Sequence, residues 1–322
     1  MRTDTAPRAF VPPPRWLDLD GRTHYVRWDG PELGIPWVLV HGLGGSLLNW
    51  MAVGPALAER GPVYALDLAG FGRTPLDDRS ATPHANRLLV HRFIHRVVGR
   101  PVLLAGNSMG GSIAMLEAAV GDRTVAGLIL TDPALPLVRR TPSDPRVVAL
   151  FAAQFIPGFG EWFARSRYRR LGPERLMDET LRLCTQDPSR IAPEVREAHV
   201  ALARERAQMG HAVPAFLRAT RSVVYATLFP AAPWRAARAV PAPALVVHGA
   251  ADRLVPLAAA HRLHRLRPDF HLTVIDDVGH IPQLEAPERW LEAVESWLAD
   301  RDVASEVERR AAAPLRPPRI AG

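Results

Sequence analysis

Short apolar runs alternate with amphipathic stretches along most of this 322-residue chain. Such runs, rich in Val, Leu and Ile and without a polar face, are typical of strands buried on both sides of a parallel sheet. Because parallel neighbours are joined by crossover helices, the alternation predicts an α/β fold: a mainly parallel sheet flanked by helices. A hairpin with its turn at Asp20-Gly21 is expected first, followed by strands over 37–42, 63–68, 102–106, 125–132, 244–249 and 271–277. Helices are expected over about 47–60, 84–99, 109–121, 256–267 and 283–299.

The alternation stops between residues 134 and 242, where amphipathic stretches occur without a strand-like run. A structureless loop of that length is uncommon in a compact domain, so a helical insertion is expected there. The predicted organisation is a discontinuous core of residues 1–133 and 243–300, a helical cap of residues 134–242 inserted after the sixth strand, and a C-terminal tail of residues 301–322.

A glycine-rich corner at residues 103–115, LLAGNSMGGSIAM, joins an expected strand to an expected helix. Its centre matches the G-x-S-x-G pattern of a nucleophile elbow. A serine on so sharp a turn has strained backbone angles, so the residues two before and two after it, Gly106 and Gly110, must lack side chains that would collide. Ser108 is therefore the candidate nucleophile, and a tight turn without chemistry is the alternative interpretation.

A serine hydroxyl needs a base to become nucleophilic. His280 is the candidate, because it follows the last expected strand in a loop freed by Gly279, just before a helix. His41 and His248 end strands and precede glycines, so each is interpreted as a structural histidine near the site.

The base in turn needs an orienting carboxylate. Asp252 lies just beyond the strand at 244–249 and is the candidate, with Asp132 at the end of the preceding strand as the runner-up. Asp67 also ends a strand, but it precedes the serine and is expected to shape a turn. The resulting order Ser, Asp, His is the order of α/β-hydrolases.

A glycine-rich loop, HGLGGS, follows the strand at 37–42. Its Leu43 backbone N–H, together with that of Met109 at the start of the helix after the corner, is the candidate oxyanion hole. The competing interpretation is a phosphate-binding loop, but no Gly-Lys-Ser/Thr follows, so no nucleotide cofactor is expected.

All 40 residues of the Lys and Arg class are arginine, and the formal net charge is +7. With 31 prolines and many alanines, this indicates a coding bias, so no nucleic-acid partner is expected. The segment from Ala134 to Ala242 holds 17 Arg against 9 Asp or Glu. A solvated surface is the simpler interpretation, and a preference for anionic substrates or surfaces is the alternative.

Cys184 is the only cysteine, so no intrachain disulfide can form. The N-terminal residues lack the apolar region of a signal peptide, and no window approaches the roughly 20 apolar residues of a membrane span. The expectation is a soluble, cytoplasmic protein without stable membrane insertion.

Five motifs, HGLGGS..NW, DLAGFGRT, GNSMGG, HGAADRLVP and GHIPQLEAPE, occur in an order that resembles the α/β-hydrolase superfamily from about Trp16 to Leu298. The resemblance implies acyl transfer through Ser108, with His280 as base and no cofactor or metal. Epoxide hydrolases and haloalkane dehalogenases are similar, but they carry an aspartate at the elbow.

The resemblance leaves three functions open for a small-molecule ligand. The first is a serine hydrolase of carboxylic esters or thioesters, with a hydrophobic substrate portion suggested by cap aromatics such as Phe151 and Trp162. The second is a hydrolase that splits a carbon-carbon bond in a ring-cleavage product, since GNSMGG also resembles that group. The third is a non-catalytic ligand-binding protein of the same fold.

Overall fold

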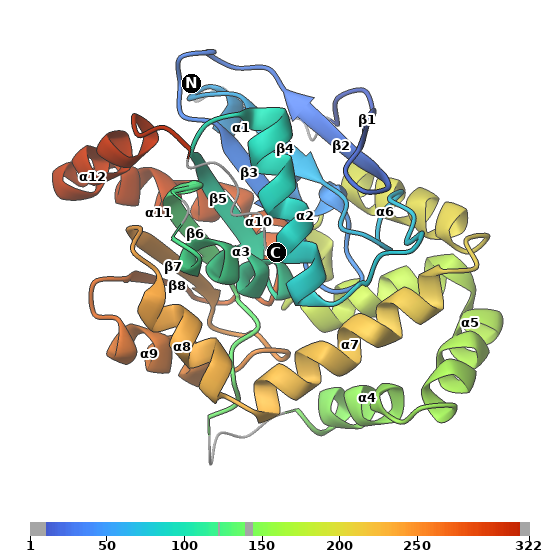
Figure 1. The fold of residues 1–322 in the computed structure, drawn as a ribbon. Helices are drawn as coiled ribbons and strands as arrows, with labels where there is room; N and C mark the ends of the chain where they lie inside the picture. Colours follow the sequence, from blue (N-terminus) through green and yellow to red (C-terminus); the bar gives the residue numbers. More distant parts are fainter. Residues whose placement is uncertain (1–10, 122, 139–143, 316–322) are drawn as a thin grey trace, which may run out of the picture.

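The computed structural model describes residues 11–121, 123–138 and 144–315. Within these residues one eight-stranded sheet has the order β1-β2-β4-β3-β5-β6-β7-β8 (Figure 1). The first two strands form the expected antiparallel hairpin, β2 also pairs antiparallel with β4, and the remaining pairs are parallel. The strands are β1 (Arg15–Asp18), β2 (Arg22–Trp28), β3 (Trp37–Val40), β4 (Val63–Leu66), β5 (Val102–Asn107), β6 (Val125–Thr131), β7 (Ala244–Gly249) and β8 (His271–Ile275).

Helices follow the strands and also fill the long interval between β6 and β7 (Figure 1). In the first part of the chain they are η1 (Leu47–Trp50), α1 (Gly54–Ala58), α2 (Pro83–Phe93), the π-helical turn η2 (Ile94–Val98) and α3 (Met109–Ala119). Between β6 and β7 lie α4 (Pro145–Phe155), α5 (Phe159–Cys184), η3 (Pro188–Arg190), α6 (Pro193–Arg206), α7 (Ala212–Leu228) and α8 (Ala231–Ala239). After β7 come α9 (Leu257–Leu266), α10 (Pro282–Glu285), α11 (Pro287–Ala299) and α12 (Arg301–Ala311).

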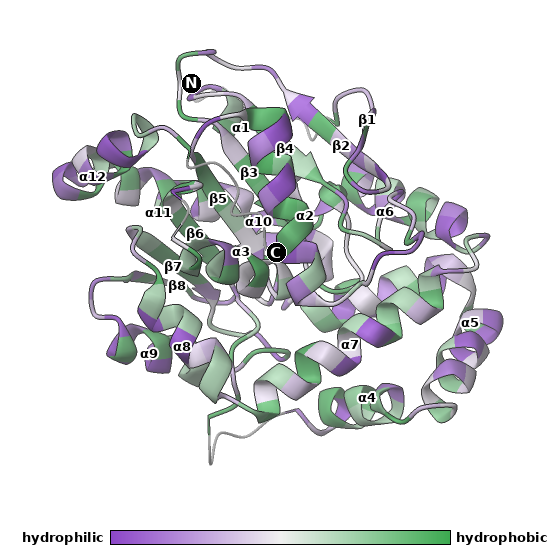
Figure 2. Ribbon diagram, viewed as in Figure 1, coloured by the Kyte–Doolittle hydropathy of each residue, from purple (hydrophilic) through white to green (hydrophobic). Residues whose placement is uncertain are grey.

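The sheet separates two hydrophobic cores. Successive residues of β3 alternate between them: Val38 packs in the core under α2, α3, α8 and α9, whereas Leu39 packs in the core under α1, α11 and α12. Both side chains are fully buried, as expected for a strand covered on both faces. The predicted fold class is therefore confirmed, and the hydropathy colouring shows the green central strands inside helices with mixed surfaces (Figure 2).

Two expected helices are broken for local reasons. The stretch at 47–60 divides into η1, capped by the Ser46 side chain, and α1, which begins at Gly54. The stretch at 283–299 divides at Ala286, immediately before a proline at the start of α11. Proline favours the first turn of a helix and interrupts a preceding helix. The apolar periodicity of the sequence therefore continues through positions where one helix ends and the next begins.

The interval between β6 and β7 is helical, as predicted, but its helices do not form one layer. Helices α4 to α7 cover the carboxyl edge of the sheet, whereas α8 packs against α3, with Trp234 and Ala237 in the sheet core. Helix α5 is kinked at Gly172, whose φ is 70°, next to Pro173. No single helix in the described part of the chain is long and apolar enough to cross a membrane; α4 and α5 meet that test only as a pair bent by 116°.

The chain after residue 300 differs from the expected tail. Asp300 caps α12 by accepting hydrogen bonds from the backbone N–H groups of Asp302 and Val303. Val303 and Val307 are buried against the sheet. These valines lie four positions apart on one helix face, and Arg310 adds hydrogen bonds to the Val125 and Pro241 carbonyls at 3.2 and 3.3 Å. Residues 316–322 lie outside the described part of the chain.

Candidate active site

Ser108 lies at the turn between β5 and α3, with φ 56° and ψ −119°. These angles are strained for a residue with a side chain, and neighbouring hydrogen bonds hold them in place. The Ser108 N–H donates to the Thr131 carbonyl at 3.0 Å, and its own carbonyl accepts from Ala134 at 2.9 Å and Ser112 at 3.1 Å. The serine is only half-buried, so its hydroxyl remains accessible at the end of a buried strand.

The flanking glycines are required by space. A Cβ on Gly106 would lie 2.2 Å from the Gly110 carbonyl oxygen, and one on Gly110 would lie 2.2 Å from the Val40 carbonyl oxygen. Both distances are far below van der Waals contact, so no larger residue fits without moving backbone. The sharp turn that presents Ser108 therefore depends on both positions.

The loop after β3 approaches the serine closely. A Cβ on Gly42 would lie 3.0 Å from the Ser108 Cβ, and the loop closes with a hydrogen bond from the Gly45 N–H to the Gly42 carbonyl at 3.1 Å. Leu43, one expected oxyanion donor, lies inside this turn and lines the same cavity as Ser108. Met109, the other, is the first residue of α3, where backbone N–H groups lack an intrahelical acceptor.

His280 follows β8 and lies in the same cavity wall as Ser108. Its Nδ1 donates to Asp252 Oδ2 at 2.7 Å. The contact leaves Nε2 as the nitrogen that can accept a proton. Only 4% of His280 is exposed, and its backbone N–H donates to the Cys184 carbonyl at 2.6 Å.

Asp252 is the carboxylate that the structure brings to His280. Its side chain is fully buried, and its Oδ1 accepts from the backbone N–H groups of Leu254 at 2.7 Å and Val255 at 3.1 Å. Burial alone would raise the pKa of this carboxyl, but the adjacent His280 and its hydrogen bond hold the pKa of Asp252 below its ordinary value. Asp252 is thus an anion behind the imidazole.

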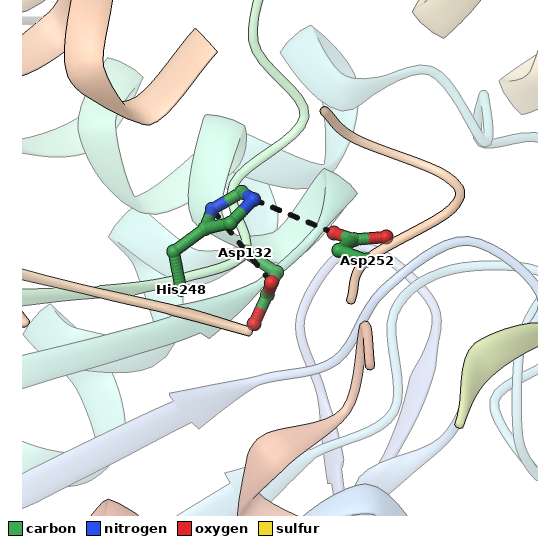
Figure 3. Close-up of side chains that lie close together, drawn as sticks. All are labelled: Asp132, His248 and Asp252. Carbon is green, nitrogen blue, oxygen red and sulfur yellow. Dashed lines mark ion pairs between the residues drawn. The ribbon is translucent and has the colours of Figure 1, made fainter. Parts of the chain in front are cut away.

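Asp132, the runner-up acid, lies in the same buried cluster, beside both His248 and Asp252 (Figure 3). Its Oδ1 is 3.7 Å from His248 Nδ1 and accepts from the Gly249 N–H at 3.0 Å. His248 Nε2 lies 3.7 Å from Asp252 Oδ2 and donates to the Val255 carbonyl at 2.9 Å. Burial and the charge of Asp252 raise the pKa of Asp132 well above its ordinary value, which favours its protonated form.

The spacing of Asp132, His248 and Asp252 also resembles that of a metal site, since one ligand atom of each lies within 4.8 Å of the others. Burial and Asp252 raise the pKa of Asp132, however, which opposes the deprotonated state that a metal ligand needs. Asp252 is already engaged by His280. Asp132 Oδ2 and His248 Nδ1 are buried without a hydrogen-bond partner in the described part of the chain.

His41 and Asp67 have structural contacts. The Leu68 N–H donates to His41 Nε2 at 3.1 Å, and burial lowers the pKa of His41, which keeps the ring neutral. Asp67 accepts from His24 Nδ1 at 2.7 Å and from the Leu47 and Arg73 backbone N–H groups, both at 2.8 Å. Asp67 thus shapes the turn after β4.

Two residues without an assigned role in the sequence analysis hold the histidine loop. The Asn107 side-chain amide donates to the His280 carbonyl at 3.0 Å and to the Thr131 carbonyl at 3.2 Å. The buried Glu285 carboxylate accepts backbone N–H groups from Gly279, Gln186 and Asp187 at 2.7 to 2.8 Å. The sequence signal for Asn107 was a polar residue at the end of an apolar strand. The signal for Glu285 was an acid six positions after Gly279.

A cavity of about 1150 Å³ opens above Ser108 between the sheet edge and helices α4 to α7. Its walls are mostly apolar, including Phe151 and Phe216, with Arg165 and Arg169 among the charged exceptions. Cys184 also lines it, but desolvation raises the pKa of this thiol to about 12, so it is not a competing nucleophile near neutral pH.

Comparison with known proteins places the chain in one family. Residues 37–293 match the alpha/beta hydrolase family. The pimeloyl-acyl-carrier-protein methyl ester esterase of Aromatoleum aromaticum is 31% identical over 257 residues, covering 78% of this chain and 93% of that protein. A 2-hydroxy-6-oxo-6-(2'-aminophenyl)hexa-2,4-dienoic acid hydrolase of Metapseudomonas resinovorans is 28% identical over 285 residues, covering 87% and 88%. Among solved structures, a thermophilic esterase from Thermogutta terrifontis superposes with a TM-score of 0.65 at 26% identity, covering 90% of this chain and 99% of that one.

Proposed function

Because this chain belongs to the α/β hydrolase family, we propose that it is a serine hydrolase that cleaves carboxylic esters or thioesters through an acyl-enzyme on Ser108. The observation that carries the proposal is the combination of Ser108 on a strained elbow with the 2.7 Å contact between His280 and Asp252 in one cavity wall. Binding alone would not require a serine on a strained elbow together with a histidine that is paired with a buried carboxylate in the same cavity.

In the proposed reaction, Ser108 Oγ forms a bond to the substrate carbonyl carbon while His280 Nε2 takes the hydroxyl proton. The electron pair of the carbonyl moves to its oxygen, which the Leu43 and Met109 N–H groups stabilise. The carbonyl reforms, the bond to the alcohol or thiol breaks, and His280 returns the proton to that leaving group. Water then repeats the sequence on the acyl-enzyme and releases the acid.

Asp252 supports both half-reactions by holding the His280 tautomer and by stabilising the imidazolium that forms. The esterase relative supports an ester substrate, and the mostly apolar cavity supports a substrate with a hydrophobic portion. An ester with a hydrophobic portion agrees with both observations, so esters are the first substrate class to test.

A carbon-carbon hydrolase is the second candidate. A dienoate substrate carries a carboxylate, and Arg165 and Arg169 line the cavity without an acidic partner within 4 Å in the described part of the chain. The dienoic acid hydrolase relative gives this alternative independent support.

The deciding experiment has two parts. Labelling by a fluorophosphonate probe is expected for the wild-type protein and is expected to disappear in Ser108→Ala; an unlabelled wild-type protein would favour a non-catalytic function. Turnover of p-nitrophenyl esters of graded chain length is then compared with turnover of a ring-cleavage dienoate. Hydrolysis of the dienoate alone would replace the ester proposal with the second candidate.

A further inference from the structure

An exposed apolar surface lies where α4 meets α5 and where α7 ends. We call it the apolar rim and define it by six residues: Val148, Ile156, Phe159, Trp162, Leu228 and Phe229. Each is about half exposed, with Trp162 at 54% and Ile156 at 53%. Exposed apolar side chains that gather in one place, unlike scattered single ones, are typical of binding surfaces.

The three helices that carry the rim, α4, α5 and α7, contact one another. Arg221 of α7 donates to the Phe155 carbonyl at 3.1 Å and pairs with Glu161 of α5 at 2.9 Å. The rings of Phe159 and Trp162 lie 5.5 Å apart. Much of α4 is coloured hydrophobic although the helix lies at the edge of the molecule (Figure 2).

The rim is also continuous with the catalytic cavity. Val148, Ile156 and Leu228 are exposed and line the cavity that contains Ser108. An occupant that covered the rim permanently, such as a second copy of the chain, would obstruct that entrance. An occupant that supplies substrate through it would not.

An arginine-lined groove adjoins the rim at Phe229. Helices α8 and α9 form this groove of about 790 Å³, which is lined by Arg235, Arg238, Arg262 and Arg265. In the described part of the chain none of the four has an acidic side chain within 4 Å; Arg262 instead lies over the Trp234 ring at 5.3 Å. An apolar patch bordered by unpaired arginines matches the profile of a surface that meets anionic lipid.

We propose that the apolar rim and the adjoining arginine groove dock the protein onto an anionic phospholipid surface, with the rim in the acyl region and the arginines at the head groups. The docking places the cavity entrance against the lipid, so an ester with a long acyl chain reaches Ser108 without crossing water. This direction of substrate entry rests on the proposed function, whereas the docking itself does not.

The test measures docking without hydrolysis. Ser108→Ala protein is sedimented with vesicles of phosphatidylcholine, with and without phosphatidylglycerol. Binding is expected to the phosphatidylglycerol vesicles and to fall as salt rises. The change Phe159→Asp with Trp162→Asp, at two residues outside the cavity wall, is expected to weaken binding by about tenfold or more. Arg235→Glu is expected to weaken it by about fivefold.

Matched controls lie on other faces of the molecule. Leu33→Asp changes an exposed apolar residue, 98% accessible, between β2 and β3, and Arg301→Glu changes an exposed arginine on α12; neither is expected to alter vesicle binding. Unchanged vesicle binding in the Phe159 and Trp162 double variant would overturn the proposal. So would the absence of vesicle binding by the Ser108→Ala protein whose rim is unchanged. So would a dimer in sedimentation without vesicles that the same double variant dissociates, because the rim would then cover a second copy.

Activity separates this inference from the proposed function. In the otherwise wild-type enzyme the Phe159 and Trp162 changes are expected to leave hydrolysis of a soluble short-chain p-nitrophenyl ester intact and to reduce hydrolysis of the same ester class presented in phosphatidylglycerol vesicles. If the double variant loses neither activity, the docking role is contradicted. Absence of both activities in the wild-type enzyme contradicts the proposed function and leaves vesicle binding to be judged by itself.

Discussion

The Asn107 side-chain amide donates a hydrogen bond of 3.0 Å to the carbonyl of His280, a residue 173 positions later in the chain. Asn107 immediately precedes the candidate nucleophile, so this bond ties the serine turn directly to the loop that holds the candidate base. The relative position of Ser108 and His280 thus depends on the Asn107 side chain, which can be mutated without changing either residue.

Asn107→Ala is expected to lower kcat/KM for an ester by about tenfold to a hundredfold, because a displacement of about 1 Å between catalytic groups can cost that much. It also leaves two buried carbonyls without this donor, which costs about 1–3 kcal/mol of unfolding free energy. The measurements are steady-state kinetics and urea unfolding.

Ser112→Ala is the matched control for Asn107→Ala. Ser112 is on α3, and its Oγ donates to the carbonyl of Ala134, in the loop after β6, at 2.6 Å, without contact to the His280 loop. A comparable loss of stability with unchanged kcat/KM is expected for this variant. Equal kinetic losses in both would mean that Asn107 acts through stability alone.

Gly110→Ala tests the space at the elbow. The new Cβ would lie 2.2 Å from the Val40 carbonyl oxygen, so the turn must shift or the chain must pay about 3 kcal/mol or more. Thermal unfolding and the yield of soluble protein report the cost, and fluorophosphonate labelling reports the position of Ser108. Gly210→Ala, where no atom lies within 4 Å of the new Cβ, is expected to stay within about 0.5 kcal/mol of the wild type. Similar behaviour of the two variants would refute the steric requirement.

The sheet and its crossovers were predictable because a strand such as β3 is apolar on both faces and is bounded by turn residues. Helix boundaries were less predictable, since the breaks at Gly54 and Ala286 depend on proline and capping rather than on periodicity. Helix α12 was not predicted as a separate helix because its segment is mostly charged and because Val303, Val307 and Arg310 contact a surface that is formed by distant residues.

The candidate site shows the same division. Ser108 carries a local signature, since its turn requires glycine at fixed offsets, and that requirement is visible in one short segment. For Glu285 the only local signal is an acid six positions after Gly279, and its importance comes from three backbone N–H groups that include those of Gln186 and Asp187, about a hundred positions away. Which helices line the cavity likewise depends on tertiary packing, so α8 could not be separated from α4 to α7 in advance.

Two buried aspartates near His280 are expected to have unequal effects on catalysis. Asp252→Asn removes the anion that accepts from His280 Nδ1, and a loss of about 10³- to 10⁴-fold in kcat is expected. Asp132 contacts His248 and the Gly249 N–H rather than His280, so a change below about tenfold is expected for Asp132→Asn. The reverse ranking, measured with one ester substrate at one pH, would assign the orienting role to Asp132.

Asp132 is also expected to give the protein a stability that declines as pH rises. Its folded-state pKa is raised by burial and by Asp252, whereas its unfolded-state pKa is about 3.9. The carboxyl therefore favours the folded state fully below about pH 4, and this contribution is lost as pH rises towards the raised pKa, at about 1.4 kcal/mol per pH unit. Asp252, whose pKa is lowered, acts in the opposite direction and only as pH falls below about 4. Asn at position 132 cannot ionise in either state, so the Tm of Asp132→Asn minus that of the wild type should become more positive as pH rises above about 4, by about 2–4 °C per kcal/mol. Parallel Tm curves for the two proteins over that range would show that Asp132 keeps an ordinary pKa in the folded state.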